Sequence, residues 1–384
     1  MKPLNQFTSN VPSSGIRTIF ELTHTMKDCI HLEIGQPDFD TPEHITEAMA
    51  KAARDGFTKY VSNSGIMELR EAISQKVTEQ NGFSIGPENI VVSAGGLCSL
   101  LITLLIFVEA GDEVLIPEPG WPNYMMQMAC LGTKGVRYPL DPENGFRIDF
   151  DALKTLVTPK TKVLLINSPS NPAGAVFPRE DLERVSEFVR RHDLYLVSDE
   201  VYENIIFEGE HVSSGLFNDN GRVAVIFSFS KTYAMTGLRV GYVVCDEKLA
   251  NRIAKIHEAV ISCATSISQK GALAALQGPQ DIVAEMVSAY KARRDAAISI
   301  LQQKNLFRYK PGGAFYTLVD ISGTGMNSTD FAIELLKNKK VAVAPGETFG
   351  ETVDSSVRIC FANDMERIIE GTNILCDWIN EKSG

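Results

Sequence analysis

The sequence predicts an α/β protein with a large domain, built on a mostly parallel seven-stranded sheet, and a smaller α/β domain. Two observations lead to this prediction. Short runs of almost wholly apolar residues alternate with longer amphipathic runs through the middle of the chain, which is typical of parallel strands covered by helices on both faces. The 384 residues are also enough for two or three domains, and Pro311-Gly312-Gly313 separates the middle of the chain from a shorter α/β segment.

Six apolar runs are the predicted strands of the large sheet. They are Ile90–Ser93, Val114–Ile116, Val163–Asn167, Leu194–Asp199, Val223–Ser228 and Val240–Cys245. Two more strands are expected in the smaller domain, near Ala314–Val319 and Val357–Phe361. We place an N-terminal arm and part of the small domain at residues 1–44, the large domain at 45–275 and the small C-terminal domain at 276–384.

Helical spacing of apolar residues predicts the segments between the strands. Glu180–His192 and Glu247–Val260 each carry an apolar stripe, and the run Val201–Phe207 (VYENIIF) is grouped with them. Leu97–Val108 is a stretch of about 12 mostly apolar residues, too short to cross a bilayer, and is predicted to be a buried helix.

Composition excludes several classes of protein. The net charge is −11 and no dense Lys/Arg stripe is present, which argues against nucleic-acid binding. The seven scattered cysteines form no CxxC pair, which is typical of buried thiols in a reducing compartment and predicts no metal site. The N-terminal residues lack the apolar segment of a signal peptide. We therefore expect a cytoplasmic protein with no membrane partner.

Polar side chains gather where three predicted strands end. They are Asn167 and Asn171, Asp199 and Tyr202, and Ser228, Ser230, Lys231 and Arg239. Each has an ordinary explanation alone: Asn-Pro-x-Gly is a turn, an Asp after a strand is a helix cap, and a loop Lys is a solvated charge. Because the carboxyl ends of parallel strands meet at one sheet edge, these side chains are expected to lie together. The set matches the needs of a phosphorylated pyridine aldehyde.

The chain also resembles a known family over nearly its whole length. The motifs, in order, are SGIRTIFEL, LEIGQPDFDTPEHI, KYVSNSGIMELREAI, DEVLIPEPGWPNY, INSPSNPAGAV, VSDEVYE, SFSKTYAMTGLRVGY, KPGGAFY, VAVAPGETFG and VRICFA. They resemble the class I/II aminotransferases of pyridoxal 5′-phosphate (PLP) fold type I, in particular the aromatic, broad-specificity and aspartate aminotransferase subgroup.

The resemblance implies a role for each residue around the cofactor ring. Lys231 would form the Schiff base (the internal aldimine) and then carry the substrate proton, which requires a neutral amine. Asp199 would pair with the pyridine nitrogen and keep it protonated. Tyr202 and Asn171 would bond the ring 3′-oxygen, and Trp121 would stack on the ring.

The resemblance also assigns the phosphate and substrate contacts. Phosphate contacts would come from Ser228, Ser230, Arg239 and the backbone of Gly95, Gly96 and Leu97 at a helix start. Tyr60 would reach the phosphate of a partner subunit, which implies a homodimer with shared active sites. Arg358 would grip the substrate α-carboxylate with two parallel hydrogen bonds, assisted by the backbone of Gly35. Trp121 and Asn171 are also expected to contact the substrate.

One departure from the family pattern bears on specificity. Some aspartate-preferring members carry a lysine where this chain has Leu97. We therefore expect apolar or aromatic L-amino acids as donors and 2-oxoglutarate or another 2-oxoacid as acceptor.

Three alternatives stay open to different degrees. A PLP-dependent lyase or cyclase could use the same fold. A nicotinamide-dependent oxidoreductase is disfavoured because no strand is followed by GxGxxG. A catalytically silent effector-binding protein is disfavoured because Lys231, Asp199 and Arg358 are all present.

Overall fold

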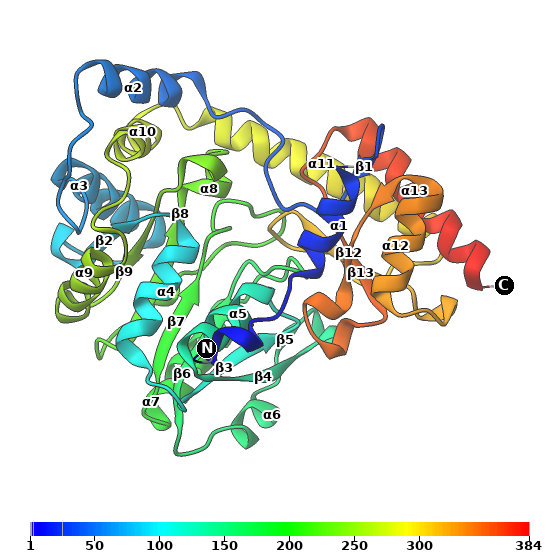
Figure 1. Ribbon diagram of the computed structural model, residues 1–384, viewed down its shortest axis with the longest axis horizontal. Helices are drawn as coiled ribbons and strands as arrows, with labels where there is room; N and C mark the ends of the chain where they lie inside the picture. The colour runs from blue at the N-terminus through cyan, green and yellow to red at the C-terminus, as the bar shows by residue number, and fades with distance from the viewer. Residues whose placement is uncertain (1, 3, 25, 384) are drawn as a thin grey trace.

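A mixed sheet of eight strands forms the centre of the larger part of the molecule (Figure 1). The computed structural model describes residues 2, 4–24 and 26–383. In spatial order the strands are β2 (Ile90–Ser93), β9 (Gly241–Val244), β8 (Val223–Ser228), β7 (Tyr195–Asp199), β6 (Thr161–Asn167), β3 (Glu113–Glu118), β4 (Lys134–Asp141) and β5 (Arg147–Ile148). The run from β8 to β4 is parallel, whereas β9 is antiparallel to both neighbours and β5 to β4. The predicted mostly parallel sheet is confirmed, with the two-residue edge strand β5 in addition to seven strands.

Each central strand is apolar on both faces, because successive side chains point to opposite sides of the sheet. In β6, Val163 and Leu165 face the layer that includes α4 (Gly96–Phe107), α5 (Pro122–Leu131) and α9 (Glu247–Ile261). The alternate residues of β6 face the layer that includes α3 (Met67–Lys76) and α7 (Arg179–Arg191). This two-sided burial explains why these strands read as continuous apolar runs.

The predicted helices on these faces are present, with one exception. Helices α4, α7 and α9 lie where the apolar spacing placed them. The run Val201–Phe207 is not helical: it forms turns, and Phe207 donates to the carbonyl of Gly312 (2.7 Å) while Ala314 donates to that of Ile205 (2.8 Å). Its apolar residues are buried by this distant segment rather than by one helical face, so the helical prediction for this run is wrong.

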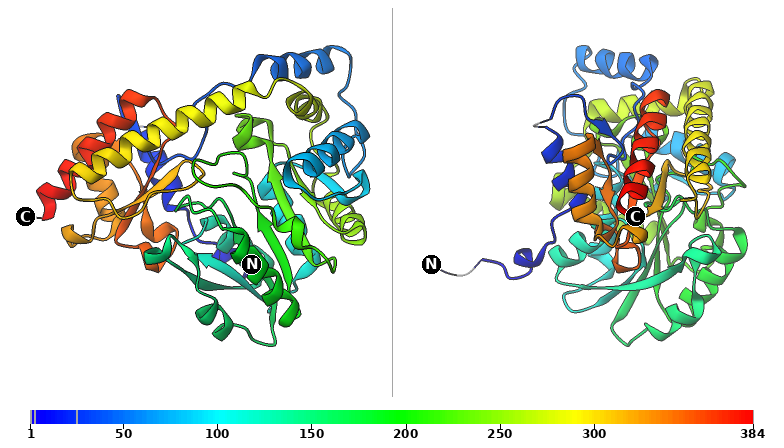
Figure 2. Two further views of the ribbon diagram at one scale, coloured as in Figure 1. Left: turned by 180° about the vertical axis from the view of Figure 1, so that it is seen from behind. Right: turned by 90° about the vertical axis from the view of Figure 1, so that its right-hand side faces the viewer.

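A smaller unit lies beside the large sheet and contains its own apolar core. Its antiparallel sheet has the order β10 (Tyr316–Asp320), β13 (Ser356–Cys360), β12 (Ala344–Pro345), and a parallel pair joins β1 (Ile30–His31) to β11 (Val341–Ala342). The long helix α11 (Asp281–Gln303) runs between the two parts, and α1 (Gly15–Thr23), from the N-terminal segment, packs on the smaller one (Figures 1 and 2). Both ends of the chain therefore contribute to the smaller unit.

The remaining elements complete the two parts. The other α-helices are α2 (Glu43–Arg54), α6 (Phe150–Thr155), α8 (Phe229–Thr232), α10 (Ser266–Gln277), α12 (Ser328–Lys339) and α13 (Met365–Ser383). Short 3₁₀ or π turns are η1 (Thr8–Asn10), η2 (Val77–Asn81), η3 (Pro87–Asn89), η4 (Pro142–Asn144), η5 (Ser214–Phe217), η6 (Thr236–Leu238), η7 (Ser322–Thr324), η8 (Gly346–Thr348) and η9 (Glu351–Val353). The predicted terminal segments include residues 1, 3, 25 and 384, which lie outside the described residues.

Three further observations bear on the predictions from composition. All seven cysteines are free, but Cys130 is exposed and only Cys245, Cys360 and Cys376 are fully buried, because the other positions lie near the surface of their elements. Within the described part of the chain, no helix is long and apolar enough to span a membrane. Among the same residues, no group of three or more His, Cys, Asp or Glu side chains is arranged to hold a metal ion.

Candidate active site

A cavity of about 590 Å³ lies beyond the carboxyl ends of β6, β7 and β8, where the large sheet faces the smaller unit. Twelve of the predicted site residues line it: Gly35, Gly96, Leu97, Trp121, Asn171, Asp199, Tyr202, Ser228, Ser230, Lys231, Arg239 and Arg358. Gly95, the residue before α4, lies beside it against Arg239. Tyr60 does not line it and is 87% exposed. A second cavity, of about 1170 Å³ at the opposite sheet edge, contains none of these residues.

Lys231 reaches the cavity from α8, directly after β8. Its Nζ donates to the carbonyl oxygen of Gly35 (2.6 Å). Burial, followed by the positive charges of Arg358 and Arg239, lowers the pKa of Lys231 to about 8. A Cβ on Gly35 would lie 1.8 Å from the hydroxyl of Tyr316, so only glycine allows this backbone to approach so closely. Lys231 therefore has the partly neutral amine that an imine-forming lysine needs.

Asp199 ends β7 and is 5% exposed. Burial raises the pKa of its carboxyl group to about 6, opposed by the hydroxyl of Tyr124, which donates to Oδ2 (2.7 Å), and by the charge of Lys231. Asn167, the last residue of β6, donates to the backbone carbonyl of Asp199 (2.9 Å). The carboxylate is thus held at a fixed position and is ionised at neutral pH.

Tyr202 lies one turn after Asp199 and is also buried. Its hydroxyl is 2.8 Å from that of Tyr316, which comes from β10 of the smaller unit. Burial raises the pKa of Tyr202 well above that of free tyrosine, so its phenol stays protonated and can donate a hydrogen bond.

An anion-binding corner lies at the start of α4. Gly95 has φ +86°, and a Cβ there would lie 2.6 Å from Nη2 of Arg239. Arg239 adopts φ +52° and is held by a hydrogen bond from Nη1 to the carbonyl of Thr236 (2.7 Å). Ser228 and Ser230 line the same region. Since the first amides of a helix have no acceptor within it, α4, two hydroxyls and a guanidinium together form a site suited to phosphate.

Arg358 crosses from the smaller unit to the large sheet. It lies on β13 and is 1% exposed, between the rings of Tyr316 and Phe349. Nη1 donates to Oδ1 of Asn171 (3.0 Å), and Nη2 donates to the backbone carbonyl of Glu33. Nε is buried and has no partner among the described residues. A buried guanidinium at the cavity wall whose Nε lacks a hydrogen-bond partner is suited to binding a carboxylate ligand.

Sequence reasoning missed several residues that complete the cavity. Tyr124 bonds Asp199 and packs edge-on against Trp121, with the ring centroids 5.6 Å apart. Tyr316 bonds Tyr202, and Arg17 and Phe20 of α1 line the mouth. The spacing of Tyr124 three residues after Trp121, at a helix start, could have indicated a shared face. The other contacts join distant elements and leave no local pattern.

Comparisons with known proteins agree with this geometry. The sequence family described as aminotransferase class I and II matches residues 27–371. A probable aspartate aminotransferase of Methanocaldococcus jannaschii is 40% identical over 373 residues, covering 95% of this chain and 97% of the relative. The aromatic-amino-acid aminotransferase 2 of Thermococcus litoralis is 37% identical over 380 residues, covering 97% of each chain.

A solved structure gives the same result for the fold. The aspartate aminotransferase from Thermus thermophilus with maleate is similar with a TM-score of 0.94 at 34% identity, covering 98% of this chain and 100% of that one. The likeness extends through both the large sheet and the smaller unit. The chain therefore belongs to the class I and II aminotransferases and has their PLP type I fold.

Proposed function

We propose that this protein is a PLP-dependent aminotransferase that moves the amino group of an L-amino acid to a 2-oxoacid. One observation carries the proposal: a lysine with a depressed pKa, a buried carboxylate and a buried arginine share one cavity. Family membership gives the same reaction class. Assignment of residues to roles is part of the proposal.

The residues of the cavity fit the cofactor. The start of α4, with Ser228, Ser230 and Arg239, would hold the phosphate. Asp199 would pair with the ring nitrogen, and Tyr202 and Asn171 would bond the ring oxygen. When bound, PLP supplies an aldehyde that captures amines and a ring that accepts electrons from the substrate Cα.

The chain itself supplies proton transfer and orientation. Nζ of Lys231, with a pKa of about 8, would take the proton from the substrate Cα and deliver it to the aldehyde-derived carbon C4′ of the cofactor. Arg358 holds the substrate α-carboxylate and so fixes the direction of the Cα–H bond. Asp199 stays ionised above about pH 6 and stabilises positive charge on the ring nitrogen.

The wall that would face the substrate side chain is mostly apolar. Ile16, Phe20, Leu97, Trp121 and Met126 line the cavity. Burial of an apolar or aromatic substrate group against them is favourable. We therefore propose that apolar or aromatic L-amino acids are the preferred donors.

A 2-oxoglutarate acceptor requires a cation for its distal carboxylate. Arg17 lines the cavity, is 70% exposed and pairs with Glu21 of the same helix (3.2 Å). It is the cationic residue of the lining that no other role uses. We assign it to the distal carboxylate, with Glu21 as its partner when an apolar substrate is bound.

Tyr60 supports a homodimer with shared active sites. Its side chain lies outside the cavity of its own chain and is exposed. A tyrosine that reaches the phosphate of the partner subunit would be exposed in a single chain. We also propose a cytoplasmic location, on the basis of the free cysteines.

A spectral titration tests the proposed reaction and separates it from a lyase or cyclase. With PLP bound, an amino acid alone should convert the cofactor fully to its amine form, and a 2-oxoacid should reverse the change. Lys231→Ala, folded as judged by circular dichroism, should do neither at a measurable rate. A cofactor that keeps its aldehyde form while the amino acid is eliminated or cyclised would contradict the proposal.

A further inference from the structure

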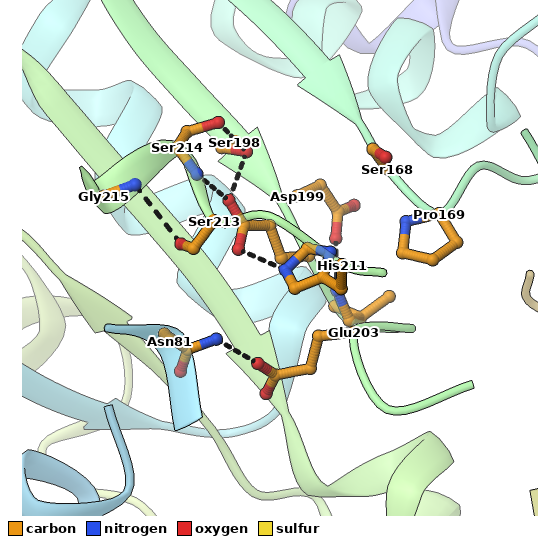
Figure 3. Close-up of polar contacts among 12 residues, drawn as sticks. Asn81, Ser168, Pro169, Ser198, Asp199, Glu203, His211, Ser213, Ser214 and Gly215 are labelled. Carbon is orange, nitrogen blue, oxygen red and sulfur yellow. Dashed lines mark hydrogen bonds and ion pairs between the residues drawn. The ribbon is translucent and has the colours of Figure 1, made fainter. Parts of the chain in front are cut away.

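Two carboxylates that are largely shielded from solvent follow the two residues that reach the cavity from the end of β7 and from the turn after it. Asp199 and Tyr202 line the cavity, whereas the residues after them, Glu200 and Glu203, do not; Glu200 is 1% exposed and the side chain of Glu203 is 9% exposed. A buried carboxylate is costly unless it is hydrogen-bonded and paired. Both have such partners (Figure 3).

Glu203 is paired with a lysine. Lys76 donates to Oε1 of Glu203 and to Oδ1 of Asn81 (2.9 Å), and Asn81 donates to Oε2 of Glu203 (2.8 Å). This network ties the turn after β7 to α3 and η2. The negative charge of Glu203 is therefore balanced by Lys76 and not by a group that titrates near neutral pH.

Glu200 is held by three groups from two segments. Its Oε1 accepts from the hydroxyl of Ser198 (2.8 Å) and from the backbone amide of Ser214 (2.9 Å). Its Oε2 lies 2.9 Å from Nε2 of His211. Figure 3 shows Ser198 and Ser214 close together, with Asp199 and His211 near them. Glu200 thereby links the end of β7, where Asp199 lies, to the segment that leads into η5.

His211 is the cation available to Glu200. Its side chain is 8% exposed, and its Nδ1 is buried without a partner among the described residues. Burial lowers the pKa of this imidazole, but the hydrogen bond and the charge of Glu200 outweigh it, so the pKa is raised. The charged groups that act on His211 are Glu200, Glu203 and Lys76.

We propose that Glu200 and His211 form a buried charge pair outside the cavity that holds Asp199 and Tyr202 in position. The positive charge of His211 also offsets the negative charge of Glu200 next to Asp199. The inference rests on the proposed PLP function, because it assigns these two residues to the support of the residue that pairs with the ring nitrogen. Neither Glu200 nor His211 lines the cavity, so both are positioning residues.

The Glu200–His211 pair affects the ionisation of Asp199 because the charge of Glu200 acts on the neighbouring carboxylate of Asp199. The groups that act on the carboxylate of Asp199 are Tyr124, the backbone of Val201, Glu200 and Lys231, and the charge of Glu200 raises its pKa. With His211 protonated, Glu200 is neutralised and Asp199 ionises more easily. Without His211, the negative charge of Glu200, next to Asp199 in the chain, has no counter-ion.

The charge pair is tested first in the cofactor-free protein. Histidine labelled with ¹³C at Cε1 gives one signal for each of the six histidines, and His211→Gln identifies that of His211. The His211 pKa should exceed that of free histidine and fall in Glu200→Gln, which keeps the size of the side chain and an oxygen for Ser198 and Ser214 but removes the charge and turns an amide donor toward Nε2 of His211. An unchanged His211 pKa in Glu200→Gln would overturn the pairing, whatever the cofactor does.

Three variants then test the effect on Asp199. The pH profiles of kcat/KM and of the absorbance of bound PLP each have a limb on the acid side. In His211→Gln the charge of Glu200 has no counter-ion, so the midpoint of both acid limbs should move up by about one pH unit. Both limbs should stay near the wild-type position in Glu200→Gln and in the double variant Glu200→Gln/His211→Gln, where no net charge remains. A purely structural role would disturb the double variant at least as much as the single ones, and that result would overturn the proposal.

A matched control separates stability from positioning. Asp181 is a buried carboxylate of α7 paired with Arg147 (2.8 Å) and does not line the cavity. Asp181→Asn should lower the melting temperature without moving either acid limb, and a limb shift comparable to that of His211→Gln would contradict the proposal. Failure of the wild-type protein to bind PLP at all would refute the proposed function. The histidine titration would still show whether Glu200 and His211 form a charge pair.

Discussion

At the scale of single residues, burial sets the protonation states on which the proposed chemistry depends. Lys231 and Asp199 could be predicted from the sequence because each follows a strongly apolar strand and belongs to a motif. Their altered pKa values could not, since these depend on burial within the folded chain and on Arg358 and Tyr124 from other elements. Glu200 and His211 were not predicted, because only the fold brings them together.

The depressed pKa of Lys231 predicts unusual reactivity in the cofactor-free protein. A lysine amine is nucleophilic only when neutral, so acylation of Lys231 should accelerate with pH up to about 8 and then level off. N-α-acetyl-lysine, with an ordinary pKa of about 10.4, should keep accelerating beyond that point. Trace labelling followed by peptide mass spectrometry measures both rates. A Lys231 profile that matches the free amine would contradict the assigned pKa.

The guanidinium of Arg358 predicts a loss of substrate affinity when its geometry changes. Arg358→Lys keeps a positive charge but cannot form two parallel hydrogen bonds to a carboxylate. We expect KM for amino acids to rise about 30-fold, equivalent to about 2 kcal/mol, with little change in PLP affinity. Arg367→Lys, at an exposed position of α13, is the control and should leave KM unchanged. Equal KM values for the two variants would exclude Arg358 as the carboxylate clamp.

At the scale of elements, the apolar runs predicted six strands of the large sheet and two of the smaller one, and apolar stretches and spacing predicted α4, α7 and α9, because burial leaves a strong local pattern in these segments. The run Val201–Phe207 was read wrongly because its backbone forms hydrogen bonds with Gly312 and Ala314, far along the chain, instead of helical ones. In the large sheet, β4 and the edge strand β5 were not predicted, and β5 is only two residues long and carries no periodicity. Local patterns thus predict elements that pack along their whole length, and fail for segments whose partner is distant.

The central position of β6 predicts a stability effect that is separate from catalysis. Leu164 is fully buried in the layer that includes α3 and α7. Leu164→Ala should lower the free energy of unfolding by about 3 kcal/mol through lost burial and a residual cavity. Urea unfolding measures this, with the exposed Lys162→Ala of the same strand as control. KM values should stay at the wild-type level; a rise would mean that the strand core and the cavity are coupled.

At the scale of the whole molecule, the candidate site exists only where the two parts meet. Lys231 bonds Gly35, Tyr202 bonds Tyr316, and Arg358 bonds Asn171, each pair joining distant parts of the sequence. The sequence predicted the large sheet and the smaller unit, and the family resemblance named most of these residues. The contacts across the boundary could not be predicted, because they depend on how the two parts pack.

The proposed sharing of active sites between two subunits predicts complementation between defective subunits. Lys231→Ala chains should have no measurable activity because they lack the amine, and Tyr60→Ala chains should have weak activity because they lack the contact to the partner's phosphate. A hybrid of the two contains one complete site, so refolding a mixture should restore up to about half of the wild-type activity per dimer in the hybrid fraction. Two successive affinity steps, one for a different tag on each chain, isolate that fraction. No recovery in a verified hybrid would contradict the assignment of Tyr60.

The most direct test is to reduce the PLP-loaded protein with borohydride, digest it and locate the cofactor by mass spectrometry. The account predicts one stable cofactor adduct per chain, on the peptide that contains Lys231, and no adduct after reduction of Lys231→Ala. An adduct on another lysine, or no covalent adduct in protein that is shown to be folded and saturated with PLP, would contradict the central claim.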